Sequence, residues 1–145
     1  LPVLLHTVND LERIGDHAVN MVEITLRKVE QKLSFTEQAL AELGQLNREA
    51  EQMFDIVIEA LETNDAEVAK SALHNEQNLN RMQLDFRRSH VQRMTDGRCS
   101  PEGGLIFVDL VDNVEKMGDH LTNIAQAVIG GLQWDGVELK TLAPE

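Results

Sequence analysis

Two copies of one short polar motif stand near the two ends of the sequence, 103 residues apart. The copies begin at Glu12 and at Glu115, and five of their nine positions are identical: Glu, Gly, Asp, His and Asn. In each copy the Glu is followed four residues later by an aspartate, Asp16 or Asp119, so the two carboxylates share one face if the segment is helical. Carboxylate oxygens on one face can bind a hard metal ion. The motif therefore suggests a metal site or another ligand site.

Both motifs lie within apolar patterns of helical spacing, which we counted in heptads. In the first segment the predicted seam runs through Leu5, Val8, Glu12, Gly15, Val19, Val22, Leu26, Val29 and Leu33. In the last segment it runs through Val108, Val111, Glu115, Gly118, Thr122, Ala125, Ile129 and Leu132. A glycine inside a helix costs roughly 0.5–1 kcal/mol relative to alanine. Gly15 and Gly118 therefore predict a close approach, either of a neighbouring helix backbone or of a metal cluster.

A structural interpretation of the motif stays open beside a ligand site. The carboxylates could form a structural network of ion pairs with Arg13 and Lys116. His17 and His120 each follow the aspartate directly, which turns the ring about 100° away from the carboxylate face. We expect these two histidines to make surface or capping hydrogen bonds rather than to bind a metal.

The segments 11–17 and 114–120 resemble the Glu/Asp-x-x-x-Asp signatures of the PhoU family of phosphate-transport regulators. Their surroundings are similar to the PhoU-like cytoplasmic domain that follows the membrane part of bacterial sodium/phosphate cotransporters. That family builds an antiparallel bundle from two three-helix repeats, with the signature on the third helix of each. The resemblance implies that residues 1–131 form an all-α antiparallel bundle of four long helices, made of one full repeat and the last helix of a preceding repeat. Residues 132–145 would form a C-terminal tail.

The resemblance and the spacing together predict the ligands of a metal site. Glu12, Asp16, Glu115 and Asp119 would bind the metal, with Asp112 and Glu76 as helpers. A set of oxygen ligands favours magnesium, manganese or iron over structural zinc, whereas the family implies iron or zinc clusters in some members, so the identity of the metal stays open. Family members carry a further acidic pair where this chain has Glu76 and Asn80, and the neutral Asn80 is a weaker ligand for a hard cation.

Composition limits the classes of partner. The net charge of −12, from 13 basic and 25 acidic residues, argues against nucleic acid as a partner and against electrostatic docking to anionic lipid.

No run of eighteen apolar residues and no signal-peptide pattern is present, so we expect no membrane insertion of this chain. The single Cys99 has no partner for a disulfide within the chain and fits a reducing, cytoplasmic setting. The sequence begins at Leu1, and the apolar pattern of the first helix is present from its first residues. We therefore interpret it as a piece of a longer protein.

Helix boundaries follow from capping signals. The first helix is expected from Pro2 to Leu33, with Ser34 and Glu37 as a capping box for the second; Asn64 and Glu67 give a similar signal for the third, which runs to Met94. Gly97 ends the third helix, Ser100 and Pro101 begin the fourth, and Gly130 and Gly131 end it. The basic run from Arg87 to Arg98 is interpreted as complementing the helix macrodipole. Trp134 is expected to pack back on the end of the bundle.

Short links predict antiparallel neighbours, with the first helix packed across the others or covered in a homodimer. Three functions fit such a bundle. The first is a non-enzymatic regulatory domain of phosphate transport or signalling that contacts a transporter membrane domain or a phosphate-signalling protein, in the cytoplasm or at the inner face of the membrane. The second is a stand-alone helical interaction module without metal. The third, a ferritin-like di-metal oxidase, is disfavoured because no Glu in the chain is followed three residues later by His.

Overall fold

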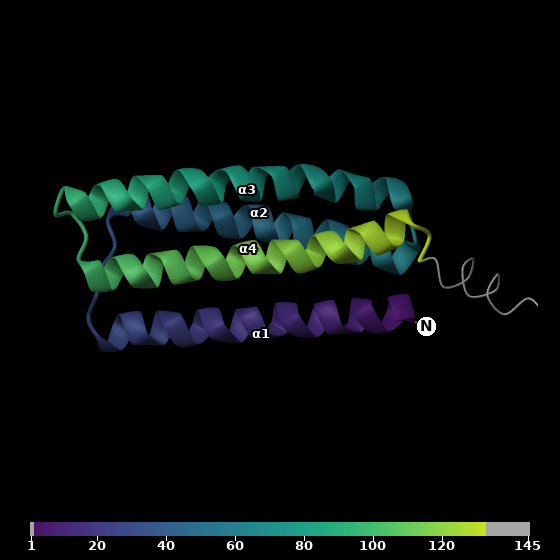
Figure 1. Ribbon diagram of the computed structural model, residues 1–145, viewed down its shortest axis with the longest axis horizontal. Helices are drawn as coiled ribbons and strands as arrows, with labels where there is room; N and C mark the ends of the chain where they lie inside the picture. Colours follow the sequence, from purple (N-terminus) through teal and green to yellow (C-terminus); the bar gives the residue numbers. More distant parts are fainter. Residues whose placement is uncertain (1, 133–145) are drawn as a thin grey trace, which may run out of the picture.

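Four long α-helices make up the residues that this computed structural model describes, residues 2–132. α1 spans Pro2–Glu30, α2 Glu37–Thr63, α3 Ala66–Thr95 and α4 Pro101–Ile129. α2, α3 and α4 pack against one another, whereas the backbone of α1 approaches α4 and no other described helix (Figure 1). The all-α bundle of four long helices predicted from the sequence is confirmed. The first helix, however, packs along one helix rather than across the others.

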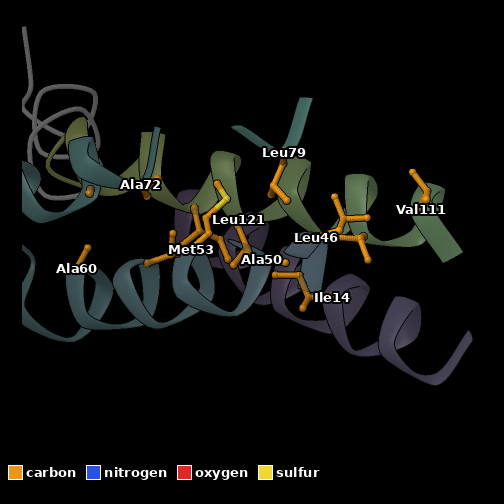
Figure 2. Close-up of a cluster of buried hydrophobic side chains, with 14 of the residues drawn as sticks. Ile14, Leu46, Ala50, Met53, Ala60, Ala72, Leu79, Val111 and Leu121 are labelled. Atoms are coloured by element: carbon orange, nitrogen blue, oxygen red, sulfur yellow. The ribbon is translucent and has the colours of Figure 1, made fainter. Parts of the chain in front are cut away.

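The main core lies between α2, α3 and α4. α4 contributes the largest share, including the fully buried Phe107 and Leu121. α3 contributes mostly alanines, such as Ala69 and Ala72, and their small side chains let it approach its neighbours closely. Figure 2 shows Ile14 of α1 reaching the edge of this cluster. α1 is therefore attached to a three-helix core that is largely complete without it.

A second, smaller apolar cluster fastens the end of the bundle where α1 leads into α2. Ile24 of α1 packs there against Ile106 and Leu110 of α4. Phe35, in the link between α1 and α2, packs on the same cluster and meets the ring of Phe107 edge-on at 5.8 Å. The side chain of Phe35 thus holds the link between α1 and α2 to the core.

Three of the predicted helix caps are as expected, and two differ. Gly130 caps the end of α4. Ser100 accepts a hydrogen bond from the amide of Gly103 at 3.0 Å, and Gly97, with φ of 73°, follows the end of α3. The cap of α2, however, is Thr36 rather than Ser34, because the inward packing of Phe35 brings the next residue to the helix entry. The first helix accordingly stops at Glu30, short of Leu33.

The cap of α3 is also one residue later than predicted. Asp65 accepts hydrogen bonds from the amides of Glu67 and Val68. Asn64 instead ends α2 in the left-handed conformation, with φ of 52°. Aspartate and asparagine are both good capping residues, so their order alone could not decide which helix each one serves.

The predicted seam of α1 is not the face that this helix buries within the described residues. Its buried residues are Thr7, Asp10, Ile14, His17 and Ile24. The apolar residues of the predicted seam face outward, and Leu26, Val8, Val19 and Val22 are between 54 and 61% exposed. The matching seam of α4 is correct, since Val111, Gly118, Thr122 and Ala125 are all buried. The heptad count found the apolar face of α1, but no described helix covers that face.

No helix within residues 2–132 combines the length and the apolar character that crossing a membrane requires. The predicted packing of Trp134, and the predicted tail beyond residue 132, lie outside the described residues.

Candidate functional site

The two copies of the repeated motif meet along the contact between α1 and α4, which run antiparallel (Figure 1). His17 Nδ1 lies 3.1 Å from Asn113 Oδ1, and His120 Nδ1 lies 2.8 Å from Asp10 Oδ1. Asp10 and Asn113 hold equivalent positions in the repeat, as do the two histidines. The two hydrogen bonds are therefore related by an approximate twofold axis between the helices.

The histidine rings of the repeat stack on each other near this axis, with their centroids 5.6 Å apart. An aspartate or amide oxygen can only accept, so each ring carries a proton on Nδ1 and donates it across the interface. Asn123 adds a second donor to Asp10, at 3.3 Å. The expectation of surface or capping hydrogen bonds is wrong for these histidines: they join the two helices, which explains part of the repeat without any ligand.

Replacing His120 by alanine should loosen α1. Asp10 is 9% exposed and would keep only its weaker contact with Asn123. A buried acceptor that loses its donor costs about 1–3 kcal/mol, so the free energy of unfolding should fall by that amount in a urea titration. Faster amide exchange should appear in α1 before the other helices. The exposed His74, changed to alanine, is the control; an equal effect of both changes would contradict the role of His120.

The predicted metal ligands fall into two separate groups. Glu12 and Asp16 are exposed on the side of α1 away from α4. Glu115 lies on the side of α4 that faces α3, where it accepts a hydrogen bond from Gln83 at 2.5 Å. Asp112, on the same face of α4, forms an ion pair with Arg87 of α3. Asp119 is exposed and Glu76 is half-buried.

The described residues do not by themselves form a metal cage. Nowhere among them do three or more His, Cys, Asp or Glu side chains gather in a way that could hold a metal ion. Calcium takes six to eight oxygens and magnesium a full octahedron. The two half-buried carboxylates of α4 already have protein partners, and the pair on α1 faces outward without other ligands from the described chain. Metal binding by these six residues stays a prediction.

The outward face of α1 repeats the face of α4 that α2 and α3 bury. Val8, Val19, Val22 and Leu26 correspond in the repeat to Val111, Thr122, Ala125 and Ile129. Gly118 shows why a glycine stands in the motif, since a Cβ there would lie 3.1 Å from Leu79 of α3. At Gly15 a Cβ would meet nothing within 4 Å. α1 thus carries a surface of the kind that accepts packed helices, and this surface is open.

The PhoU domain matches residues 1–25 and 43–128, which is most of the chain. The chain belongs to the PhoU domain family. It is 29% identical over 126 residues to the phosphate-specific transport system accessory protein PhoU homolog 1 of Thermotoga maritima, an alignment that covers 87% of this chain and 53% of that protein. It is 21% identical, also over 126 residues, to the corresponding PhoU homolog of Streptococcus pneumoniae serotype 4, with 87% of this chain and 57% of that protein covered.

This PhoU domain spans about half the length of the curated relatives that it matches. No solved structure matches it significantly. The family match includes both copies of the signature, on α1 and on α4. It leaves out residues 26–42, where α1 ends and α2 begins.

A groove between α1 and α2 runs beside the outward face of this PhoU domain's first helix. Its volume is about 720 Å³. Leu11, Gly15 and Ala18 of α1 form one wall, and Ala50 and Phe54 of α2 form the other. Val114, Met117 and Leu121 of α4 form the floor. The lining is mostly apolar, which suits an amphipathic helix better than a phosphate ion or a metal.

A buried polar cluster at the opposite end from the N-terminus was not foreseen. Arg93 of α3 is 1% exposed and forms an ion pair with Glu42 of α2. Its Nη2 also lies 2.7 Å from Nδ1 of His90, whose ring stacks on Phe107 at 4.0 Å. Arg93 is therefore not a solvated residue of the helix end, whereas Arg88 and Arg98 of the same basic run are exposed. One signal was available: Arg93 follows Phe86 by seven residues, which places it on the packed side of α3.

The same cluster encloses Cys99. Its Sγ lies 3.2 Å from Nε2 of His90. Arginine can only donate, so Nδ1 of His90 accepts from Arg93, and the proton of the neutral ring sits on Nε2, directed at the sulfur. Burial raises the pKa of the Cys99 thiol, and the positive charge of Arg93 opposes this rise only in part. A protonated, buried thiol is a poor nucleophile, so the cluster fixes the links between helices rather than performing chemistry.

Proposed function

We propose that this chain is a non-enzymatic regulatory domain of phosphate transport or phosphate signalling that works by packing helices against a partner protein. Two things support the phosphate assignment: membership of the PhoU family and the names of its relatives, which are accessory proteins of phosphate-specific transport systems. We further propose a cytoplasmic location at the inner face of the membrane, with this chain as part of a sodium/phosphate cotransporter and the transporter's membrane domain as the partner.

The outward face of α1 is the observation that carries this proposal. It is apolar, continuous with the groove beside it, and a copy of a face that is largely buried in α4. Contiguous exposed apolar patches mark interaction sites on proteins in water. The exposed Glu12 and Asp16 lie on the same helix. If a metal binds this chain there, as we predicted, the partner must add the missing oxygens.

Charged substitutions on this face should uncouple the domain from phosphate transport. Val22 and Leu26 are 61% and 54% exposed on α1, and Leu84 and Val91 are exposed to the same extents, 61% and 54%, on α3. The Val22→Asp/Leu26→Asp variant of the full-length native protein should disturb the regulation of phosphate uptake, measured with radiolabelled phosphate in cells shifted from low to high phosphate. Leu84→Asp/Val91→Asp is the matched control.

Protein levels measured by immunoblot separate loss of regulation from loss of the protein. A milder pair, Val22→Ser/Leu26→Ser, serves if the aspartate variant is degraded. Uptake that responds to phosphate as in the wild type, at equal protein level, would count against the α1 face as the regulatory surface. An equal disturbance by the α3 control would do the same.

A further inference from the structure

On α4, Glu115 of the signature and the nearby Asp112 face hydrogen-bond donors of α3 rather than acceptors. The two antiparallel helices are in register turn by turn: Leu79 lies against Gly118, Gln83 binds Glu115, and Arg87 pairs with Asp112. A metal site would need further oxygen ligands at these positions of α3. Arginine has no acceptor atom, and the amide of Gln83 uses its nitrogen toward Glu115. α3 therefore presents a cation where a metal ion would sit.

Asp112 and Glu115 need that positive charge. They lie three residues apart on one helix face, and both are half-buried. Two carboxylates so placed repel each other, and partial burial raises the cost. The guanidinium of Arg87 is 37% exposed and its Asp112 partner 33%, so the pair is only partly screened by water. Because arginine does not lose its proton near neutral pH, this neutralisation does not vary with pH or with the supply of metal.

The first copy of the motif supports the link between Arg87 and Asp112. The position equivalent to Asp112 on α1 is Asn9, which is exposed. No described helix brings an arginine to that face of α1. At this position a carboxylate occurs only in the copy that an arginine covers; the first copy carries its carboxylate one residue later, on Asp10, which binds His120 of α4.

We propose that Arg87 acts as a built-in counter-ion at the α4 signature and takes the place of a metal ion there. The α4 copy then holds α3 and α4 together without metal, and a divalent cation binds it only after Arg87 is removed. The two copies of the signature differ in this respect, because Glu12 and Asp16 on α1 remain open to a cation.

Manganese titration of a variant set tests this proposal. All variants carry Glu12→Gln/Asp16→Asn, so that the carboxylates of α1 contribute no binding. In that background the parent protein and the Arg88→Met control should bind Mn²⁺ weakly, with the same melting temperature in EDTA and in excess MnCl₂. Arg88 is the exposed neighbour of Arg87 and has the same charge. Arg87→Met should melt lower in EDTA, bind Mn²⁺ roughly tenfold more tightly or better by calorimetry, and regain stability with Mn²⁺.

Adding Asp112→Asn to Arg87→Met should abolish the new Mn²⁺ binding, which assigns it to the α4 signature. Three results would overturn the proposal: Mn²⁺ binding by the parent that Asp112→Asn weakens; Mn²⁺ affinity unchanged by Arg87→Met; or lost stability in Arg87→Met that Mn²⁺ does not restore, which would make Arg87 a plain ion-pair partner. If Arg87→Met does not fold, Arg87→Lys keeps the charge and should remain indifferent to Mn²⁺; binding by that variant would equally contradict the counter-ion role.

Discussion

Replacing Arg93 by methionine is expected to lower the free energy of unfolding by about 3–5 kcal/mol. The change leaves the carboxylate of Glu42, which is 6% exposed, without its cation. Glu42 Oε2 already lacks a hydrogen-bond partner, so the buried charge would have no compensation left. His90 would also lose the donor to its Nδ1. Urea unfolding followed by circular dichroism at pH 7 measures the effect.

A double-mutant cycle distinguishes the lost pair from lost packing. Glu42→Met combined with Arg93→Met should be markedly less destabilised than Arg93→Met alone, because an apolar pair leaves no buried charge. Arg98→Met is the surface control: its ion pair with Asp96 is half exposed, and pairs of this kind contribute about 0–1 kcal/mol. A cost for Arg93→Met no larger than that of Arg98→Met would show that the buried pair does not hold this end of the bundle.

Acidification should destabilise the protein through His90. Burial, and then the positive charge of Arg93, lower the pKa of His90 from 6.5 to about 4. Below pH 6.5 the ring of His90 is protonated in the unfolded chain, whereas in the folded chain it stays neutral down to about pH 4. Acid therefore favours the unfolded state across this window. At about 1.4 kcal/mol per pH unit, the free energy of unfolding should fall by about 3 kcal/mol between pH 6.5 and pH 4. Below pH 4 His90 should cause no further loss.

The variant His90→Gln isolates this contribution, since glutamine offers an acceptor to Arg93 but does not titrate. Its free energy of unfolding should fall less steeply than that of the wild type between pH 6.5 and pH 4, by up to one proton in slope. His74→Gln, at an exposed position of α3, should keep the wild-type slope in this window. Identical slopes for the wild type and His90→Gln would refute the assignment.

Local signals predicted most of the fold. The periodicity of α4 identified its buried face, and Ser100, Pro101 and Gly97 marked helix ends correctly, because caps depend on residues within one turn. The caps at Thr36 and Asp65 were missed by one or two residues. In the first case the decisive contact is between Phe35 and rings that lie far along the chain, and no local rule contains it.

The sites were harder to predict than the helices. Asp112 pairs with a residue on another helix, and Arg93 pairs with Glu42, 51 residues earlier. No spacing rule relates such residues, since their encounter depends on the register between helices. The face that α1 buries against α4 was not predicted, for a related reason. A helix with an apolar face and a second face of Asp10, Ile14 and His17 can be buried on either, and periodicity alone favours the more apolar one.

The attachment of α1 to a single neighbour has a thermodynamic consequence. Such a helix can detach while the other three stay folded, so the chain has at least two levels of opening rather than one. A partner that covers the outward face of α1 binds only its docked form, and by mass action it must hold α1 in place more firmly as its own concentration rises. The fraction of molecules in which α1 is docked then measures how much partner is bound. A change in that fraction alters the position of any segment that is joined to α1.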